Sequence, residues 1–345
     1  MNMEIKLETM HSLRKRWDMY KEYLKHFLSI KIDRIKVYLK CLLSGKNTFK
    51  GLLKLITTAI GYISSIYTFS VLTKDLLGIN QLEQLCKNFW WILIIIGVIA
   101  SLIHNHEKIS CRGIYKNNDF QIEVKVDDLF ALKGSSFVIP TNTYFRTIME
   151  REYISPRSVQ GAFQLKYFRK DIEKLDQLIA ASLKQQGKIR EKCSDIHGTV
   201  YKYPIGTVAK VDHKGKHYYF VAINDVNKYG KPINQEYENI NKALKGLLET
   251  INTSGHYDDL VMPLIGTGRA AINEATIEKV VKNIVDTFLA SNRKIARKLT
   301  ICIRPRDYLE GRADLKIIND YVDFSCRFQY DSLTKCPCRK GYHDK

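Results

Sequence analysis

Two apolar segments joined by a short polar link constrain the fold of this chain most strongly. The first, Gly51–Leu72, supplies the roughly 20 predominantly apolar residues that an α-helix needs to cross a bilayer, and Lys54 is its only charged residue. The second, Phe89–Ile103, is shorter and more apolar, and the tryptophans near its start are typical of a membrane interface. The sequence therefore predicts an integral membrane protein with a two-helix transmembrane hairpin over residues 51–103.

The distribution of basic residues predicts the topology and argues against a nucleic-acid partner. Residues 1–50 hold 12 Lys and Arg against 5 Asp and Glu, in a chain of net charge +19, and this block directly precedes the first apolar segment. Lys and Arg are dense on both outer flanks of the hairpin and sparse in residues 73–88. The positive-inside rule then predicts both termini in the cytoplasm, with residues 73–88 on the other side of the membrane. We expect contact with anionic lipid and no nucleic acid.

The basic region 1–50 also contains a helical stripe of apolar residues. Leu13, Trp17, Leu24 and Leu28 are among the residues that recur at three- and four-residue steps, and Lys and Arg cover much of the remaining surface. A basic amphipathic helix before a membrane span is typical of an element that lies on the inner leaflet. The alternative is a helix that packs on the domain that follows the hairpin.

Residues 111–330 follow a different pattern, in which short β-rich runs alternate with helical ones. Strands are predicted over 121–126, 137–139, 207–211, 217–223, 260–264 and 299–303, and helices over 170–185, 235–251, 274–289 and 308–321. The polar turn at 212–216 predicts a hairpin between the two strands that flank it. The alternation predicts a three-layer α/β/α sandwich on a mixed sheet, with residues 331–345 as a C-terminal tail.

The eight cysteines are scattered along the chain. This pattern indicates a reducing compartment rather than a disulfide framework. Cys336 and Cys338, with His343 nearby, make half a metal site at most. The sequence therefore predicts no metal.

Ligands of such sheets bind beyond the C-terminal ends of the strands, and one strand end carries a glycine-rich turn. The strand over 260–264 is followed by Gly266, Thr267, Gly268 and Arg269, and a helix comes next. Glycines allow a ligand to approach the backbone closely, and amides at a helix start favour phosphate. On its own this turn is a weak signal, because many tight turns contain two glycines.

Other segments carry side chains that suit the rest of a nucleotide. Asp128 follows the first of these strands and is placed to accept a hydrogen bond from an adenine amino group, and Asn142, after Thr141, could bond a ribose hydroxyl. The segment 154–163 offers hydroxyls, an amide and a glycine suited to phosphate, at Ser155, Ser158, Gln160 and Gly161. Each of these features alone is equally explained by turn or cap chemistry, but together they favour a binding site.

The combination resembles a macro domain, the fold that binds ADP-ribose, over residues 111–325. Asp128 looks like the adenine-reading aspartate of that family, Thr141 and Asn142 like the end of its ribose loop, and residues 266–268 like its second phosphate loop. More narrowly, the stretches VIPTNTYF, ISPRSVQGAF, YPIGTVAKV and MPLIGTGRAAI, which follow two membrane spans, resemble the membrane-anchored macro-domain effectors of Thoeris anti-phage defence.

The resemblance implies a role in abortive infection. A TIR-domain partner would make an ADP-ribose-derived signal from NAD, such as the amino-acid conjugate histidine-ADP-ribose, and no other cofactor is expected. Binding would drive homo-oligomerisation and membrane disruption. Tyr308 would stack on the adenine or line the pocket. The Ser- and Thr-rich first span is then either an ordinary span or a helix that packs against copies of itself.

One departure from the family pattern bears on catalysis. Hydrolytic macro domains usually carry a glycine-rich first phosphate loop with a catalytic aspartate or glycine arrangement nearby, whereas Ser155–Gly161 has no carboxylate to act as a general base. We therefore expect a binder with no catalytic residues. A membrane-tethered ADP-ribosyl hydrolase is the alternative, and a nucleic-acid-binding anchor is the third hypothesis.

Overall fold

The computed structural model describes residues 2–42, 48–104, 109–115, 119–149, 153–187, 190–195, 198–227, 229–254, 259–268, 272–291 and 295–334. The chain forms two compact units, one of residues 1–31 with 110–345 and one of residues 32–109. Helix α1, Asn2–Leu42, contributes to both units. Arg269 and the expected half metal site at Cys336, Cys338 and His343 lie outside the described residues.

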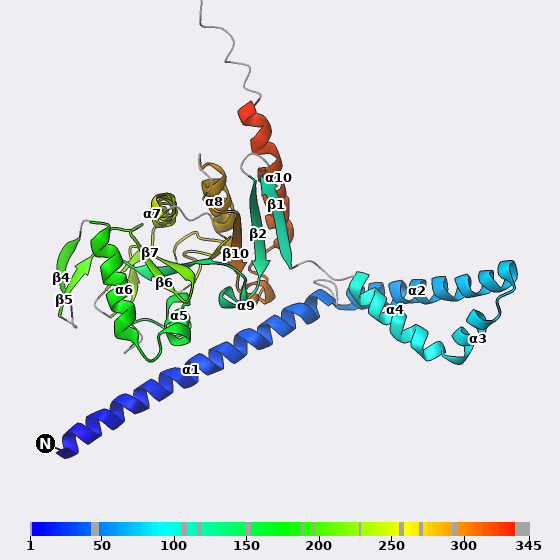
Figure 1. Ribbon diagram of the computed structural model, residues 1–345, viewed down its shortest axis with the longest axis horizontal. Helices are drawn as coiled ribbons and strands as arrows, with labels where there is room; N and C mark the ends of the chain where they lie inside the picture. The colour runs from blue at the N-terminus through cyan, green and yellow to red at the C-terminus, as the bar shows by residue number, and fades with distance from the viewer. Residues whose placement is uncertain are drawn as a thin grey trace, which may run out of the picture. The chain divides into compact units, whose positions relative to one another are not determined.

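The unit of residues 32–109 contains the apolar helices (Figure 1). Helix α2, Thr48–Leu77, packs along α4, Trp90–His104, and the short α3, Gln81–Asn88, lies between them in the chain. Among the described residues, one helix is long and apolar enough to cross a bilayer alone, over Leu52–Leu77. Helices α3 and α4 reach that length only together, with an 85° bend between them. The first predicted span thus exists as a helix, whereas the second is short and bent.

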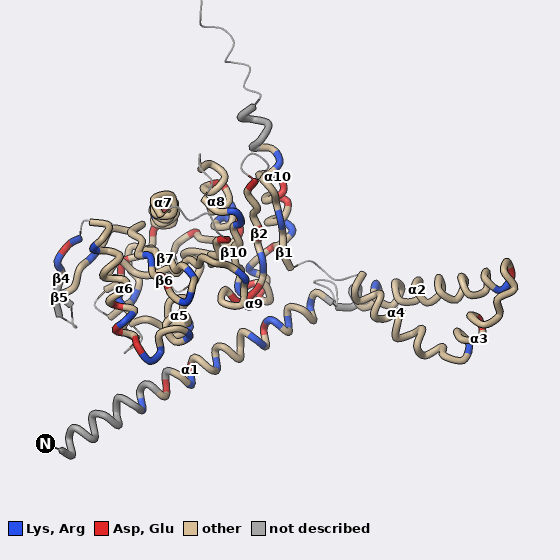
Figure 2. Tube along the Cα trace, in the orientation of Figure 1, with Lys and Arg blue, Asp and Glu red and all other residues tan. Residues whose placement is uncertain are grey.

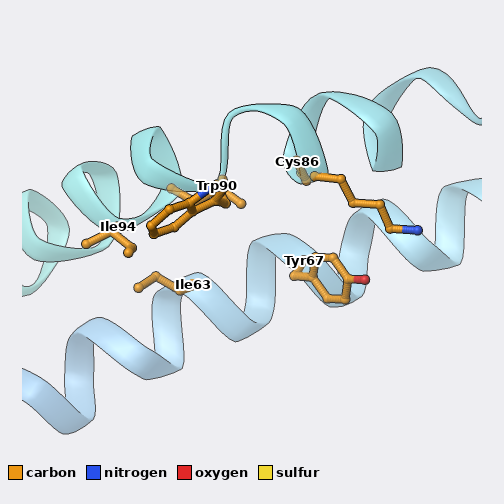
Figure 3. A pocket seen from close by; sticks show the side chains of 7 residues that line it. Ile63, Tyr67, Cys86, Trp90 and Ile94 are labelled. Carbon is orange, nitrogen blue, oxygen red and sulfur yellow. The ribbon is translucent and has the colours of Figure 1, made fainter.

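Small residues bring α2 and α4 into close contact. The buried Ser101 hydroxyl donates a hydrogen bond to the carbonyl of Leu55 at 2.7 Å. A Cβ on Gly97 would come within 2.6 Å of Ile63 Cγ1, so only glycine permits this spacing. Figure 3 shows the groove beside this contact, between α2 and the bend, which is lined by Ile63, Tyr67, Cys86, Lys87, Trp90, Leu93 and Ile94.

The other unit is built on a mixed sheet of order β1-β2-β10-β9-β3-β7-β6, with the short β8 paired to β7. Strands β2, β10, β9, β3 and β7 run parallel to one another. At the two edges of the sheet, β1 pairs with β2 and β6 pairs with β7 in the antiparallel direction. A separate hairpin is formed by β4 and β5. The strands are β1 Ser110–Tyr115, β2 Phe120–Val126, β3 Ser136–Asn142, β4 Glu191–Asp195, β5 Gly198–Lys202, β6 Val208–His213, β7 Lys216–Val226, β8 Pro232–Ile233, β9 Asp259–Pro263 and β10 Lys298–Ile303.

Helices cover both faces of this sheet, so the predicted three-layer α/β/α sandwich is confirmed. Alternate residues of β3 and β7, such as Phe137 and Phe220, form one core with Phe163 of α5 and Leu175 of α6. Helix α7 packs on β7 and on α8, and α10 packs on α8 and β1. The helices are α5 Val159–Tyr167, α6 Ile172–Gln185, α7 Glu238–Ser254, α8 Ile277–Leu289, α9 Pro305–Leu309 and α10 Leu315–Thr334, and the 3-10 turn η2 is Leu129–Ala131.

Local sequence signals account for the turns that hold these elements. The predicted hairpin at 212–216 is confirmed, since β6 and β7 are joined through Lys214 and Gly215, both at positive φ as a tight two-residue hairpin turn requires. The single helix expected over 308–321 is wrong. Gly311 adopts φ +73°, which ends α9 before α10 begins.

Several elements have no counterpart among the sequence predictions, among them β1, α5 and the β4–β5 hairpin. Strand β1 alternates in burial along its length, and Arg112 within it pairs with Glu123 of β2 at 2.9 Å. Helix α5 is short and mostly buried, so it lacks the amphipathic pattern that marks a longer surface helix.

Candidate functional site

The carboxyl ends of five parallel strands meet at one edge of the sheet, and the segments that follow them form the candidate site. Parallel strands place their carboxyl ends together by construction. The sequence could predict which residues follow each strand, but the strand order decides which segments become neighbours. In order across the sheet, these segments begin at Asp127 after β2, Arg304 after β10, Leu264 after β9, Thr143 after β3 and Asn227 after β7.

Asp128 is held in a fixed orientation at the end of β2. It is the N-cap of η2, and its carboxylate accepts a hydrogen bond from the amide of Phe130 at 3.3 Å. Its own amide donates to Asp127 Oδ1 at 2.8 Å, and the Asp127 carboxylate lies 3.3 Å from Lys125 Nζ. The side chain is half-buried. The local turn thus presents a partly exposed carboxylate at the edge, as the sequence predicted for that position.

Asn142 ends β3 in an Asx turn. Its side-chain oxygen accepts from the amide of Tyr144 at 3.0 Å, and the register with β7 shifts between Thr141 and Asn142. The amide group is buried. The turn and the irregular pairing fix the plane of this side chain at the edge of the sheet.

Thr141 and Gln160 bind each other. The Thr141 hydroxyl donates to Gln160 Oε1 at 3.0 Å, and Gln160 Nε2 donates to the carbonyl of Arg146 at 2.7 Å. Both side chains are buried. This geometry gives them a role in holding the start of α5 against the end of β3.

The loop before α5 is a tight, self-bonded turn. Ser158 is the N-cap of α5, accepting from the amide of Gly161 at 3.0 Å and donating to the carbonyl of Ser155 at 2.7 Å. A Cβ on Gly161 would lie 2.0 Å from that same carbonyl oxygen. Ser155 Oγ in turn accepts from the amide of Arg157 at 3.3 Å. The serines therefore shape the loop, and Arg157 projects from it with an exposed side chain.

The two glycines after β9 differ in role. Gly266 is buried at φ +84°, and its carbonyl accepts from the amide of Ile272 at 3.0 Å, so the turn itself requires glycine there. Gly268 is exposed, and a Cβ there would meet nothing within 4 Å. Thr267 donates to the carbonyl of Leu264 at 3.4 Å. Gly268 is thus the position of this loop that faces open space.

Tyr308 lies on α9, after the last strand of the site, and is half-buried. The same helix buries Asp307, which accepts hydrogen bonds from Arg304 at 2.7 and 3.0 Å and pairs with Arg312 at 2.6 Å. This ion-pair cluster fixes α9 at the edge of the sheet. The sequence analysis did not single out Arg304 or Asp307, although the Pro at helix position N1 marks the helix start.

A second buried cluster, also missed from the sequence, lies at the end of β7. The Asp225 carboxylate accepts from Thr143 at 2.7 Å, from Lys202 at 2.9 Å and from Asn234 at 3.3 Å. Burial alone would raise the pKa of Asp225, but these hydrogen bonds and the Lys202 charge outweigh it and lower the pKa. Asp225 is therefore a fully engaged structural carboxylate. No single-sequence signal connects residues this far apart.

The first half of α1 packs on this edge of the domain. Glu22 Oε1 lies 3.2 Å from Arg157 Nε, and the Arg169 guanidinium lies over the ring of Tyr20 at 3.4 Å. Burial lowers the pKa of His26, and the charges of Arg157 and Arg304 lower it further. Around Tyr20–His26 the structure therefore realises the alternative prediction, a helix that packs on the domain.

No group of His, Cys, Asp and Glu side chains suited to a metal ion occurs among the described residues.

The family model described as Thoeris protein ThsA, Macro domain matches residues 122–304, which is more than half of the chain. A macrodomain of Oceanobacillus iheyensis solved with ADP is 14% identical, with a TM-score of 0.41 over 61% of this chain and 97% of that one. A Thermosipho africanus DarTG structure in complex with ADP-ribose is 11% identical, with a TM-score of 0.39 over 61% of this chain and 47% of that one. The macrodomain of Thermus aquaticus DarG is 13% identical, with a TM-score of 0.36 over 53% and 99%. No curated protein sequence gives a significant match.

The matched range begins within β2 and ends at Arg304, directly after β10, so it includes the strand-end segments after β2, β9, β3 and β7 but not Tyr308 of α9. Through this macro domain, the chain belongs to the Thoeris ThsA family.

Proposed function

We propose that this chain is a membrane-anchored effector whose macro domain binds an ADP-ribose-type signal. The observation that carries the proposal is the arrangement of Asp128, Asn142 and the turn at Gly266–Gly268 on one edge of a ThsA macro domain. Asp128 would accept from the adenine amino group, and Asn142 would bond a ribose hydroxyl. The turns before α5 and after β9 would hold the diphosphate with backbone amides.

The hairpin supports a membrane location because its apolar side chains lie on the outside. Only 17% of the most apolar window in Leu52–Leu77 is buried, whereas the core helix of a water-soluble domain buries most of such a surface. Large side chains along both α2 and α4 are exposed, including Ile56, Ile60, Ile95 and Ile99. A bilayer would cover this surface, with both termini in the cytoplasm of the bacterial inner membrane.

The proposed output is membrane disruption by ligand-driven self-association. A TIR-domain partner would supply the signal, for which histidine-ADP-ribose is one candidate, and the cell would die before the phage completes its cycle. The groove beside α2 and the exposed apolar side chains of the hairpin give surfaces on which copies could pack.

We propose binding without catalysis, because the turn from Ser155 to Gly161 holds no carboxylate and Asp225 is committed to three side-chain partners. The alternative function, an ADP-ribosyl hydrolase, is distinguished from a binder by the release of ADP-ribose from a modified protein. Incubating the full chain with ADP-ribosylated protein should release no ADP-ribose, and release that depends on Asn142 would favour the enzyme.

The binding test uses the full chain in nanodiscs and calorimetry with ADP-ribose, NAD and histidine-ADP-ribose. Gly268→Phe projects a ring from an exposed loop position where a Cβ would meet open space, so it should block the ligand while the fold persists. Ala181→Phe adds the same ring at an exposed position of α6 and is the matched control. Binding that survives Gly268→Phe, or no heat from any of the three compounds with the unmodified chain, would contradict the proposed site.

A further inference from the structure

Helix α1 has one face turned towards the domain and one turned away. Between Tyr20 and Lys31, the half-buried residues recur at three- and four-residue steps, namely Tyr20, Glu22, Tyr23, His26, Phe27 and Ile30. Trp17, Leu24 and Leu28 lie on the exposed face. A helix shows this division when one side is covered. Figure 2 shows that the coloured part of this helix also carries several basic residues.

The covered face lies on the segments that form the candidate site. Glu22 pairs with Arg157 of the turn before α5, and Tyr20 is stacked by Arg169 just after α5. Tyr23 is close enough to Asp128 for that carboxylate, together with burial, to raise the tyrosine's pKa. His26 interacts electrostatically with three charged residues of these segments, Arg157, Arg304 and Asp128. Three residues of α1, Glu22, Tyr23 and His26, thus interact with three of the strand-end segments, and Tyr20 contacts Arg169 just beyond α5.

The Glu22 carboxylate presents to Arg157 the same kind of anionic oxygen acceptor that a ligand phosphate would present. A guanidinium binds carboxylate and phosphate oxygens with the same fork of N–H donors. A diphosphate brings two negative charges to the turn that carries Arg157, against the single charge of Glu22. One guanidinium therefore has two anionic partners that compete for it.

We propose that residues 20–30 of α1 form a latch over the ligand site, and that a diphosphate ligand displaces the latch by taking Arg157 from Glu22. This inference rests on the proposed function and names the regulation of the same site. Helix α1 ends at Leu42 and α2 begins at Thr48, so the latch is connected to the apolar helices by a very short stretch of chain. Release of α1 would therefore report ligand binding to the part of the protein that acts on the membrane.

The latch contacts are weak enough for a ligand to break. The side chains of Arg157 and Glu22 are 66% and 41% exposed, and an exposed pair of this kind shifts an equilibrium by about 1.4- to 5-fold. The stacking of Arg169 on Tyr20 is of similar size at an exposed site, about 2- to 5-fold. A ligand that binds the unlatched state modestly more tightly than the latched state therefore overcomes both the ion pair and the stacking contact.

Two substitutions with opposite charge changes separate latch release from simple electrostatics. Glu22→Gln removes a negative charge and should tighten ADP-ribose binding by about 2- to 5-fold. Arg169→Gln removes a positive charge, which by itself would weaken binding of an anion, yet release of Tyr20 should tighten it. Asp18→Asn, an exposed carboxylate one turn before Glu22, is the matched control and should leave affinity unchanged.

The experiment measures calorimetric affinity for ADP-ribose and hydrogen exchange of residues 20–30, both on the full chain in nanodiscs. Without ligand, exchange should rise in Glu22→Gln and Arg169→Gln but not in Asp18→Asn. Adding ADP-ribose should raise it in the unmodified chain. Equal affinity in all variants, weaker binding by Arg169→Gln, or protection of residues 20–30 by ADP-ribose would overturn the competition.

The readouts also separate the two proposals. If no protein binds ADP-ribose, the proposed function fails and the competition fails with it, whatever the exchange shows. If ADP-ribose binds but the ligand-free exchange of residues 20–30 is the same in every variant, the site stands and the latch is refuted.

Discussion

Gly161→Ala tests whether the turn before α5 is set by close packing. In the structure, the new Cβ would lie 2.0 Å from the carbonyl oxygen of Ser155, far inside van der Waals contact, and the obstacle is backbone rather than a flexible side chain. Ser158 donates to that same oxygen and accepts from the amide of Gly161, so moving the turn also disturbs the N-cap of α5.

The magnitude follows from three contributions. Overpacking costs about 1–3 kcal/mol, and loss of a Ser N-cap costs about 1 kcal/mol. Replacing Gly by Ala in a helix returns about 1 kcal/mol. The net loss of about 1–3 kcal/mol should lower the thermal midpoint by roughly 2–12 °C for a domain of this size.

Gly268→Ala is the matched control, because its Cβ meets no atom within 4 Å and the free energy of unfolding should change by less than about 1 kcal/mol. Thermal unfolding of the full chain, followed by near-ultraviolet circular dichroism from the buried tyrosines, compares the two variants. Equal midpoints for Gly161→Ala and the unmodified chain would refute the packing argument.

Two further predictions concern the buried cluster of the domain and the hairpin. Asp225→Asn should destabilise the domain by about 1–3 kcal/mol, because the half-buried Lys202 and the buried Thr143 lose a charged acceptor. The pKa of Asp225 is lowered in the folded state, so this carboxylate stabilises the fold fully above the ordinary carboxyl pKa and loses that effect as the pH falls through the lowered value. The thermal unfolding midpoint should therefore fall less steeply with decreasing pH in Asp225→Asn than in the unmodified chain, when both are measured below a pH of about 4. In the hairpin, Ser101→Ala should weaken the α2–α4 contact by about 0.6 kcal/mol. Gly97→Leu should weaken the α2–α4 contact more than Ser101→Ala does, since its Cβ would meet Ile63 at 2.6 Å. Hydrogen exchange of α4 in nanodiscs should therefore be faster in Ser101→Ala than in the unmodified chain and fastest in Gly97→Leu. The reverse order would contradict the contact.

The five parallel strands, strand β6 and helices α6, α7 and α8 could be predicted because each is encoded by neighbouring residues. Continuous apolar runs mark the buried parallel strands such as β7, and Lys214-Gly215 marks the hairpin before it. The position of Asp128 and Asn142 at the sheet edge could also be predicted, since a polar side chain at the end of a strand lies there wherever that strand is placed, and their ligand-binding roles stay predictions. Helix α5 and strand β1 were missed because burial on the sheet, rather than a local pattern, stabilises them.

The sequence alone determined which segments are apolar, which residues follow each strand and the excess of basic charge before the hairpin, because these properties depend on residues close together in the chain. Only the tertiary structure decided that Gly161 and Gly266 are needed by their turns while Gly268 faces open space, since this depends on atoms from other segments. It also decided that Thr141 and Gln160 bind each other, and that Glu22 of an apparently membrane-facing helix pairs with Arg157. Such contacts depend on strand order and helix placement, which no local pattern of residues specifies.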